Sequence, residues 1–433
     1  MKVLTISSNN GMYTPSCPSS KAQMKYFKKI LKENGIEETR LVKETDYIVY
    51  SSCAFDGKTM DENIKDIKDL MKLQQVEGNH FKVLLTGCFI KNFDGDKISD
   101  DVILIKDNVW SKAALDYILE KEKNITVKDM LNSKVSSYAN DNEILLSMNI
   151  VGGCINKCSF CKTNYINNKV ESLPYDELLE FLKDKIKNGT KALDLHGDSL
   201  NLYGIDLAGK PILHKLLHEL GKEKDLNIIS LGEVTPQNMY PELLKEIKNN
   251  SKVKAVTLQL ESASDEVLKN MNRNYTISRY DDIASSIINS GKYVDTILMS
   301  GFPLETYDDL SKTIEYIEKR RIYVSGVCQY VDSPHIPSHD LKQLARNEKM
   351  KHTRFLKDRI KDINIEIQKE NIEKMANGIV FRKYDDCIFT VGGTRTFAYS
   401  TKHKDLKLGD VIEEPPKTFV KKSKYSNKNI YKY

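Results

Sequence analysis

The chain has 433 residues, of which 40% are hydrophobic and 29% are charged, a composition that excludes a disordered or fibrous protein. Lys and Arg total 66 against 61 for Asp and Glu, so the formal net charge is +5. No apolar run reaches the roughly 18 residues that cross a bilayer, and the first residues do not form a secretory signal, which predicts a cytoplasmic protein without a membrane partner. In such a protein, eight cysteines are expected to be metal ligands or catalytic thiols before disulfides.

Strand-like and helix-like segments alternate along the first part of the chain. Apolar runs predict strands at 2–8, 46–51, 82–86 and 102–105, and helical spacing predicts helices at 20–34, 58–75 and 111–120. This alternation predicts a parallel sheet in an open α/β layer. We assign it to an N-terminal domain at residues 1–125, and a polar linker lies within 121–142.

A second and longer alternation begins at Ile144. Strands are predicted at 144–150, 192–196, 227–230, 255–259, 294–299 and 323–329, and helices at 174–187, 210–221, 241–249, 264–271 and 278–290. Repeated strand–helix units predict a partial or full parallel barrel, whose reactive end is formed by the C-terminal ends of the strands. We assign this barrel to residues 143–365.

The last part of the chain differs in composition from the barrel. A polar, helix-prone stretch at 340–376 precedes short strand-like runs and glycine-rich turns, which predict a small β-barrel-like domain at 370–416. Residues 417–433 contain six lysines and no acid, interleaved with Tyr425, Tyr431 and Tyr433. We interpret them as a basic tail that either contacts the phosphates and bases of a nucleic acid or is a solvated, frayed end.

Three cysteines, Cys154, Cys158 and Cys161, follow the first predicted strand of the barrel with the spacing C-x3-C-x2-C. Thiolates favour iron–sulfur clusters, zinc or Cu(I). A structural zinc or a fully protein-bound cluster takes four ligands, and no fourth Cys or His follows nearby. The spacing therefore favours a [4Fe–4S] cluster in which the open iron binds S-adenosylmethionine. A zinc site completed from elsewhere and reduced structural cysteines are the alternatives.

The motif resembles that of the radical S-adenosylmethionine enzymes, and the rest of the chain resembles their methylthiotransferase branch. Three segments carry this resemblance: residues 154–165, residues 262–276 with the pattern S-x-S-x-x-V-L-x-x-M-x-R-x-Y, and residues 300–306 with the sequence S-G-F-P-L-E-T. They are most similar to the archaeal and eukaryotic tRNA methylthiotransferases. The resemblance implies an α/β protein with an N-terminal open domain, a central radical S-adenosylmethionine partial (β/α) barrel and a small C-terminal β-domain.

The resemblance also implies a second [4Fe–4S] cluster in the N-terminal domain. Its ligands would be Cys17, Cys53 and Cys88, each of which follows a predicted strand. The carboxyl ends of parallel strands meet at one edge of an open sheet, so cysteines distant in sequence can converge there. Buried structural cysteines are the alternative. Cys328 and Cys387 have no such context, and we interpret both as packing residues.

For S-adenosylmethionine itself, the resemblance places four residues at the cofactor. Asp198 would accept a hydrogen bond from the ammonium group, Gly197 would permit close backbone approach, and Glu261 would accept from a ribose hydroxyl. Phe160 lies within the cysteine motif. Structural capping is an equally good interpretation of both acids. His196 ends a predicted strand, where it either lines the site or has a structural role.

The function implied is insertion of a methylthio group at an unactivated C–H bond. The resemblance favours the C2 carbon of N6-threonylcarbamoyladenosine in tRNA, with a residue of a ribosomal protein or other peptide as the alternative. Departures from the branch pattern, such as Leu304 for Gly and Glu261 for Gln, lie near the expected site. A non-catalytic RNA-binding module is a third possibility. We expect a monomer that receives electrons from a donor such as flavodoxin or ferredoxin.

Overall fold

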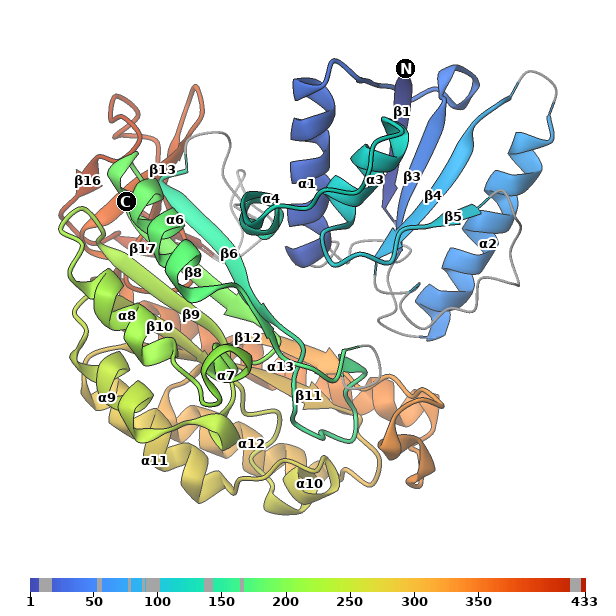
Figure 1. The fold of residues 1–433 in the computed structure, drawn as a ribbon. Coiled ribbons are helices and arrows are strands. Elements are labelled where there is room, and N and C mark those ends of the chain that lie inside the picture. The colour runs from blue at the N-terminus through green and yellow to red at the C-terminus, as the bar shows by residue number, and fades with distance from the viewer. Residues whose placement is uncertain are drawn as a thin grey trace. The chain divides into compact units, whose positions relative to one another are not determined.

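The computed structural model describes residues 1–7, 18–52, 57–76, 79–87, 90, 102–135, 143–163, 167–420 and 430–433. The chain divides into two compact units, Met1–Ser136 and Ser137–Tyr433 (Figure 1). No helix of the described residues has both the length and the apolar character needed to cross a membrane.

The first unit is built around a five-stranded sheet with the order β2-β1-β3-β4-β5. All its pairings are parallel, which confirms the predicted open α/β layer. The strands are β1 (Lys2–Ser7), β2 (Glu37–Glu38), β3 (Tyr47–Ser52), β4 (Lys82–Gly87) and β5 (Val102–Leu104), and the helices are α1 (Pro18–Glu33), α2 (Gly57–Gln74), α3 (Trp110–Ile118) and α4 (Val127–Asn132). Phe27 of α1 packs against Trp110 of α3 in the core.

The second unit contains a seven-stranded sheet with the order β12-β11-β10-β9-β8-β6-β7. Its strands are β6 (Leu145–Gly152), β7 (Glu171–Ser172), β8 (Ala192–Gly197), β9 (Ile228–Val234), β10 (Val253–Leu258), β11 (Tyr293–Ser300) and β12 (Tyr323–Gln329). Every pairing is parallel except that of β7 with β6. The first and last strands of this order do not pair with one another among the described residues, so the sheet is a partial barrel, as predicted.

Helices cover the outer face of this sheet (Figure 1). They are α6 (Tyr175–Lys187), α7 (Ile205–Ala208), α8 (Leu213–Gly221), α9 (Pro241–Asn249), α10 (Asp265–Asn270), α11 (Ile277–Asn289), α12 (Tyr307–Arg320) and α13 (Arg346–Glu370). Side chains alternate between the two faces of a strand. In β8 the fully buried Leu193 and Leu195 therefore share one face, and Asp194 and His196 share the other. Polar side chains thus occupy the inner face of the barrel.

A third sheet, also in the second unit, has the order β16-β13-β14-β15-β18-β17. Its strands are β13 (Gly378–Lys383), β14 (Ile388–Val391), β15 (Ala398–Ser400), β16 (Val411–Ile412), β17 (Thr418–Val420) and β18 (Ile430–Lys432). Residues at the starts of barrel strands, such as Leu145 and Ala192, share an apolar cluster with Ile379 and Phe389 of this sheet. The small β-domain therefore closes the end of the barrel opposite to its reactive end.

The prediction of a separate basic tail at 417–433 is wrong for the described residues of that segment. Strand β18 pairs with both β15 and β17 inside the sheet. Tyr431 is fully buried, and its hydroxyl donates to the backbone carbonyl of Gln368 in α13 at 3.1 Å. Tyr433 is also buried. Burial of these rings outweighs the charge of the surrounding lysines because each large aromatic side chain removes extensive apolar surface from water. Tyr425 lies outside the described residues.

Candidate cluster and cofactor site

The three cysteines of the motif lie on the loop that follows β6. Cys154 and Cys158 are buried, and Cys161 is partly exposed. The loop turns at Gly153, whose φ is +73°, and a Cβ at this position would meet the carbonyl oxygen of Lys169 at 1.8 Å. Only glycine fits both the left-handed conformation and this close approach. The glycine before the motif therefore sets the path that brings the cysteines to the end of the barrel.

Hydrogen-bond donors surround the three sulfur atoms. The backbone N–H of Asn156 donates to Cys154 Sγ at 3.4 Å, and that of Thr163 donates to Cys161 Sγ at 3.4 Å. Arg273 Nη1 donates to Cys158 Sγ at 3.3 Å, and Gln237 Nε2 lies 3.9 Å from the same sulfur. These donors favour thiolates.

Burial opposes ionisation of the same thiols in the absence of a cation. It raises the pKa of Cys154 to about 11, against the N–H of Asn156, and it also raises the pKa of Cys161. A bound metal centre would offset this desolvation because it holds thiolates as ligands.

The donor set fits a [4Fe–4S] cluster better than a single ion. Among the residues that the structure describes, no three His, Cys, Asp or Glu side chains surround one point as ligands of one ion would. In a cluster each thiolate binds a different iron, so the three sulfurs need not converge. The zinc alternative finds no fourth ligand in the described part of the chain.

Asp198 and Gly197, at and just beyond the end of β8, have structural contacts in this site. Asp198 Oδ2 accepts the backbone N–H of Gly153 at 2.6 Å, so this carboxylate fastens the start of the cysteine loop. A Cβ at Gly197 would meet Val151 Cγ1 at 2.3 Å, so the glycine permits β6 and β8 to approach closely. This loop contact is a structural role for Asp198 that differs from the helix capping considered as its alternative.

Glu261 and Phe160 have different surroundings in this site. Glu261 is buried with a φ of +66°, and its Oε1 lies 4.0 Å from Arg273 Nη2. Burial raises the pKa of Glu261, and the guanidinium opposes this shift. Phe160 packs against an apolar cluster that includes Val267 and Met271. A role in packing the loop is therefore visible for Phe160.

Arg273 belongs to the M-x-R-x-Y pattern, but nothing in the sequence alone assigns it to the cysteine site. Its guanidinium contacts Cys158 and Glu261 and lies over the ring of Tyr275, 5.3 Å from the ring centroid. Glu261 follows β10 and forms a β-bridge with Leu298 of β11. Through its contacts with Cys158 and Glu261, the arginine therefore connects the cysteine loop to the ends of β10 and β11. The contact between Arg273 and Cys158 cannot be recognised from the sequence, because 115 residues separate the two positions.

His196 lies in an ion-pair network inside the barrel. Its Nε2 is 2.7 Å from Asp194 Oδ2, and its Nδ1 is 3.0 Å from Glu233 Oε2. The packing role predicted for Cys387 agrees with its burial, whereas Cys328 is exposed on β12. The latter prediction was wrong because β12 is an edge strand of the open barrel and its last two residues, Cys328 and Gln329, are exposed.

The three cysteines predicted to hold a second cluster, Cys17, Cys53 and Cys88, lie outside the described residues. The strands that precede two of them are described. Ser52 at the end of β3 pairs with Gly87 at the end of β4, so these two strands end at the same level of the sheet. The positions from which the chain continues to Cys53 and Cys88 are therefore adjacent.

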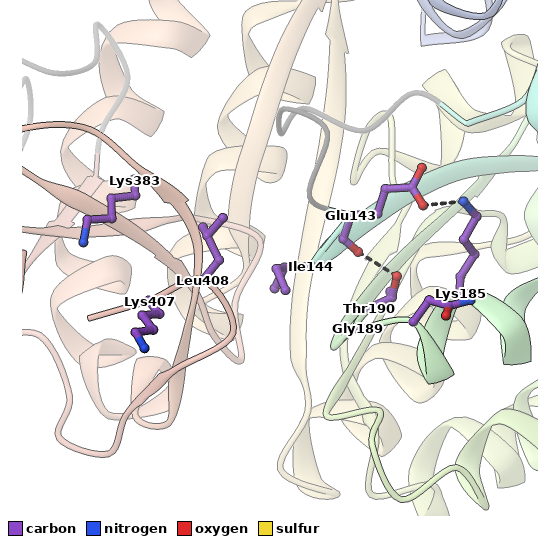
Figure 2. Close-up of a pocket in the computed structure, with 9 residues that line it drawn as sticks. Glu143, Ile144, Lys185, Gly189, Thr190, Lys383, Lys407 and Leu408 are labelled. Carbon is purple, nitrogen blue, oxygen red and sulfur yellow. Dashed lines mark hydrogen bonds and ion pairs between the residues drawn. The ribbon is translucent and has the colours of Figure 1, made fainter. Parts of the chain in front are cut away.

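A pocket of about 570 Å³ lies at the other end of the barrel (Figure 2). Lys383, Lys407 and Leu408 of the β-domain line one side, and Glu143, Ile144 and Lys185 line the other. Lys185 Nζ pairs with Glu143 Oε2 at 2.5 Å. Ile144 precedes β6 and Cys154 follows it, so the eight residues of this strand separate pocket and cysteines by about 26 Å. This pocket is not part of the cysteine site.

Two family models match the chain. Residues 148–317 match the radical SAM superfamily, and residues 11–105 match the uncharacterized protein family UPF0004. The chain is 25% identical to the ribosomal protein uS12 methylthiotransferase RimO of Carboxydothermus hydrogenoformans, over 96% of this chain and 95% of that protein. It is 26% identical to RimO of a Thermoanaerobacter species, over 93% of this chain and 96% of that protein.

Solved structures agree on the fold. A radical S-adenosylmethionine methyltransferase, TsrM from Kitasatospora setae, has a TM-score of 0.54 at 11% identity and covers 78% of this chain and 75% of its own. The cobalamin-dependent S-adenosylmethionine radical enzyme OxsB has a TM-score of 0.51 at 12% identity and covers 83% of this chain and 56% of its own. The three-cysteine loop lies at the reactive end of a partial barrel, as the radical SAM match requires. The near full-length relatives agree with this arrangement. The chain is a radical S-adenosylmethionine enzyme, and over nearly its whole length it is similar to methylthiotransferases.

Proposed function

We propose that this enzyme inserts a methylthio group at an unactivated C–H bond of a protein, with ribosomal protein uS12 as the first candidate. One observation carries the proposal: relatives named uS12 methylthiotransferases align with 93% to 96% of this chain, which includes all three sheets. They favour the peptide alternative over the tRNA substrate that the sequence pattern suggested.

The structural support for tRNA is also smaller than the sequence suggested. The tRNA prediction relied on the β-domain and on an aromatic, lysine-rich tail. In the described residues, Tyr431 and Tyr433 are buried in the third sheet and are not available to stack on bases. The lysines of residues 421–429 lie outside the described residues. Modification of tRNA is therefore kept as an outcome of the test below.

The proposed roles follow from the contacts of each residue. Cys154, Cys158 and Cys161 would hold the cluster, which would supply the electron for reductive cleavage of S-adenosylmethionine. Arg273 donates to the sulfur of Cys158, and Asp198 fixes the loop through Gly153. We assign Asp198 and Glu261 to cofactor binding as well, because both lie beside the cysteine loop or its arginine. Flavodoxin or ferredoxin is the proposed electron donor.

We further propose that Cys17, Cys53 and Cys88 hold a second [4Fe–4S] cluster. The match to UPF0004 spans residues 11–105 and so includes all three cysteines. Adjacent ends of β3 and β4 support convergence of the two loops that follow them. This cluster would supply the sulfur that is transferred.

The test is an anaerobic reaction of the iron- and sulfide-reconstituted enzyme with S-adenosylmethionine and dithionite. One arm contains purified uS12, and a second contains total tRNA from the same cells. Mass spectrometry of the protein and of the tRNA nucleosides then locates a methylthio group that replaces hydrogen. A modified residue of uS12 supports the proposal. Modification of threonylcarbamoyladenosine alone would overturn the substrate assignment.

The control for this reaction is the Cys154→Ala, Cys158→Ala, Cys161→Ala variant, reconstituted and treated in the same way. We expect it to form neither 5′-deoxyadenosine nor modified uS12, because it lacks the ligands of the cluster that binds S-adenosylmethionine. Modification of uS12 by this variant would mean that the motif is not the reaction centre.

A further inference from the structure

A chain of charged side chains crosses the inner face of the barrel. It begins at Arg395, which the β-domain contributes from the loop between β14 and β15, and whose Nη1 lies 2.9 Å from Asp194 Oδ1. Asp194 pairs with His196 at 2.7 Å, and His196 pairs with Glu233 of β9 at 3.0 Å. The reaction scheme above uses none of these four residues.

The ionisation of this network follows from its contacts. Burial lowers the pKa of His196, but the carboxylates on both sides of its ring outweigh this effect and raise it to about 10. Burial raises the pKa of Asp194 and Glu233, and the neighbouring cations His196 and Arg395 bring both below their usual values. At neutral pH, His196 is therefore an imidazolium that donates from both ring nitrogens.

The network carries more negative than positive groups. Asp295 of β11 is a third carboxylate, fully buried, and its Oδ2 lies 3.7 Å from Arg395 Nε. Apart from Arg395, only the side chain of Thr257 in β10 acts on Asp295 as a further stabilising group among the described residues. Three carboxylates face two cations, so the inner face can accept one further positive charge.

Glu233 is the member of the network that is open to a ligand. Its side chain is 35% exposed, compared with 20% for Arg395, 14% for Asp194 and 11% for His196. Glu233 is the penultimate residue of β9. Gln237, four residues further on, lies 3.9 Å from Cys158 Sγ. The carboxylate is therefore at the end of the barrel that holds the cysteines.

The local backbone is shaped to present this carboxylate. Glu233 has a φ of +51°, which is uncommon for a residue with a Cβ. At the preceding position, a Cβ on Gly232 would meet His196 Nδ1 at 2.5 Å, so the glycine makes room for the ring that holds Glu233. Strained backbone of this kind persists where surrounding contacts impose it.

We propose that Glu233 is a substrate-binding carboxylate that receives a lysine or arginine side chain of the protein substrate. His196 is a positioning residue that holds Glu233, and Asp194 and Arg395 hold His196 in turn. The excess negative charge of the network selects a cationic group, and the position of Glu233 brings that group to the reactive end of the barrel. This inference rests on the proposed protein substrate.

The test compares steady-state kinetics of the reconstituted wild type and the Glu233→Gln variant with uS12 as substrate. We expect the KM for uS12 to rise about 10- to 100-fold, the range that loss of one charge-assisted hydrogen bond supplies, with a smaller change in kcat. Glu233→Asp keeps the charge and should recover part of the affinity. His196→Gln should also raise KM more than it lowers kcat.

Glu242→Gln is the matched control, because Glu242 is an exposed carboxylate on α9, outside the barrel interior. Its KM should equal that of the wild type. Iron content per chain verifies that each variant folds and binds its clusters. An unchanged KM in a fully loaded Glu233→Gln enzyme would overturn the inference and leave the proposed function intact.

A second measurement separates the two proposals. N-acetyl-arginine amide should bind the wild type in calorimetric titration and lose at least about tenfold in affinity in Glu233→Gln, whereas the neutral N-acetyl-citrulline amide should bind neither. This result would support the carboxylate site even if uS12 were not modified. Equal binding of arginine amide by wild type and variant would overturn it.

Discussion

Replacement of Asp295 by Asn should stabilise the protein, and the effect should grow with pH. Asp295 is fully buried in the barrel. Burial raises its pKa to about 6, despite the opposing effects of Arg395 and Thr257, and the carboxylates of Asp194 and Glu233 add to the shift. Because the folded state holds this proton more tightly than the unfolded state, the stability that Asp295 contributes is present at low pH. It is lost as pH rises from the unfolded value of 3.8 through about 6.

The magnitude follows from the size of this shift. About two pKa units at 1.36 kcal/mol each correspond to roughly 3 kcal/mol lost at pH 8 and about half of that lost at pH 5. Asn has no charge to desolvate at either pH, so the difference between Asp295→Asn and wild type should widen by about 1.4 kcal/mol from pH 5 to pH 8. In a unit of this size that is a change of about 3 to 6 °C in the Tm difference.

Thermal unfolding of both proteins at the two pH values measures this difference. The control is Asp308→Asn, because the side chain of Asp308 is 74% exposed and pairs with Lys312 at the surface. Its Tm difference from wild type should stay nearly constant with pH. A Tm difference for Asp295→Asn that is the same at pH 5 and pH 8 would refute the raised pKa of this carboxyl group.

Three further outcomes are expected. Reconstituted wild type should contain about eight irons per chain in a colorimetric assay if both clusters form. Replacement by Ala of either cysteine set should halve this iron content; the sets are Cys154, Cys158 and Cys161, and Cys17, Cys53 and Cys88. Full iron content in the variant of the second set would disprove the second cluster. Arg273→Gln should lower the reduction potential of the cluster, followed by electron paramagnetic resonance during redox titration, because it weakens donation to Cys158 Sγ; an unchanged potential would contradict this contact. Tyr431→Ala should lower the free energy of unfolding by about 3 to 5 kcal/mol, as for other large buried aromatic side chains. Tyr384→Ala, at an exposed position, should change the free energy of unfolding little in the same denaturation experiment. Equal effects of the two substitutions would place Tyr431 outside the core.

The sequence by itself determined the features that depend on local spacing. Alternating strands and helices predicted both parallel sheets, because each element carries its own periodicity of apolar residues. The close spacing of Cys154, Cys158 and Cys161 indicated a cluster loop for the same reason, since all three ligands lie on one short segment. Gly197 was recognisable beside this loop, although the close contacts that require glycine at Gly153 and Gly197 became visible only in three dimensions.

Only the tertiary structure decided the contacts between residues distant in the chain. The lysine-rich end resembled a tail because charge dominates its composition, yet β18 completes a sheet with strands formed more than 30 residues earlier, as the pairing of Ala398 with Tyr431 shows. Arg273 reaches Cys158, and Arg395 enters the barrel from another domain to meet Asp194. A lone arginine carries no periodicity, so its partner is set by which strand ends and loops the fold brings together. The same reason applies to His196 and Glu233, whose pairing depends on the adjacency of β8 and β9.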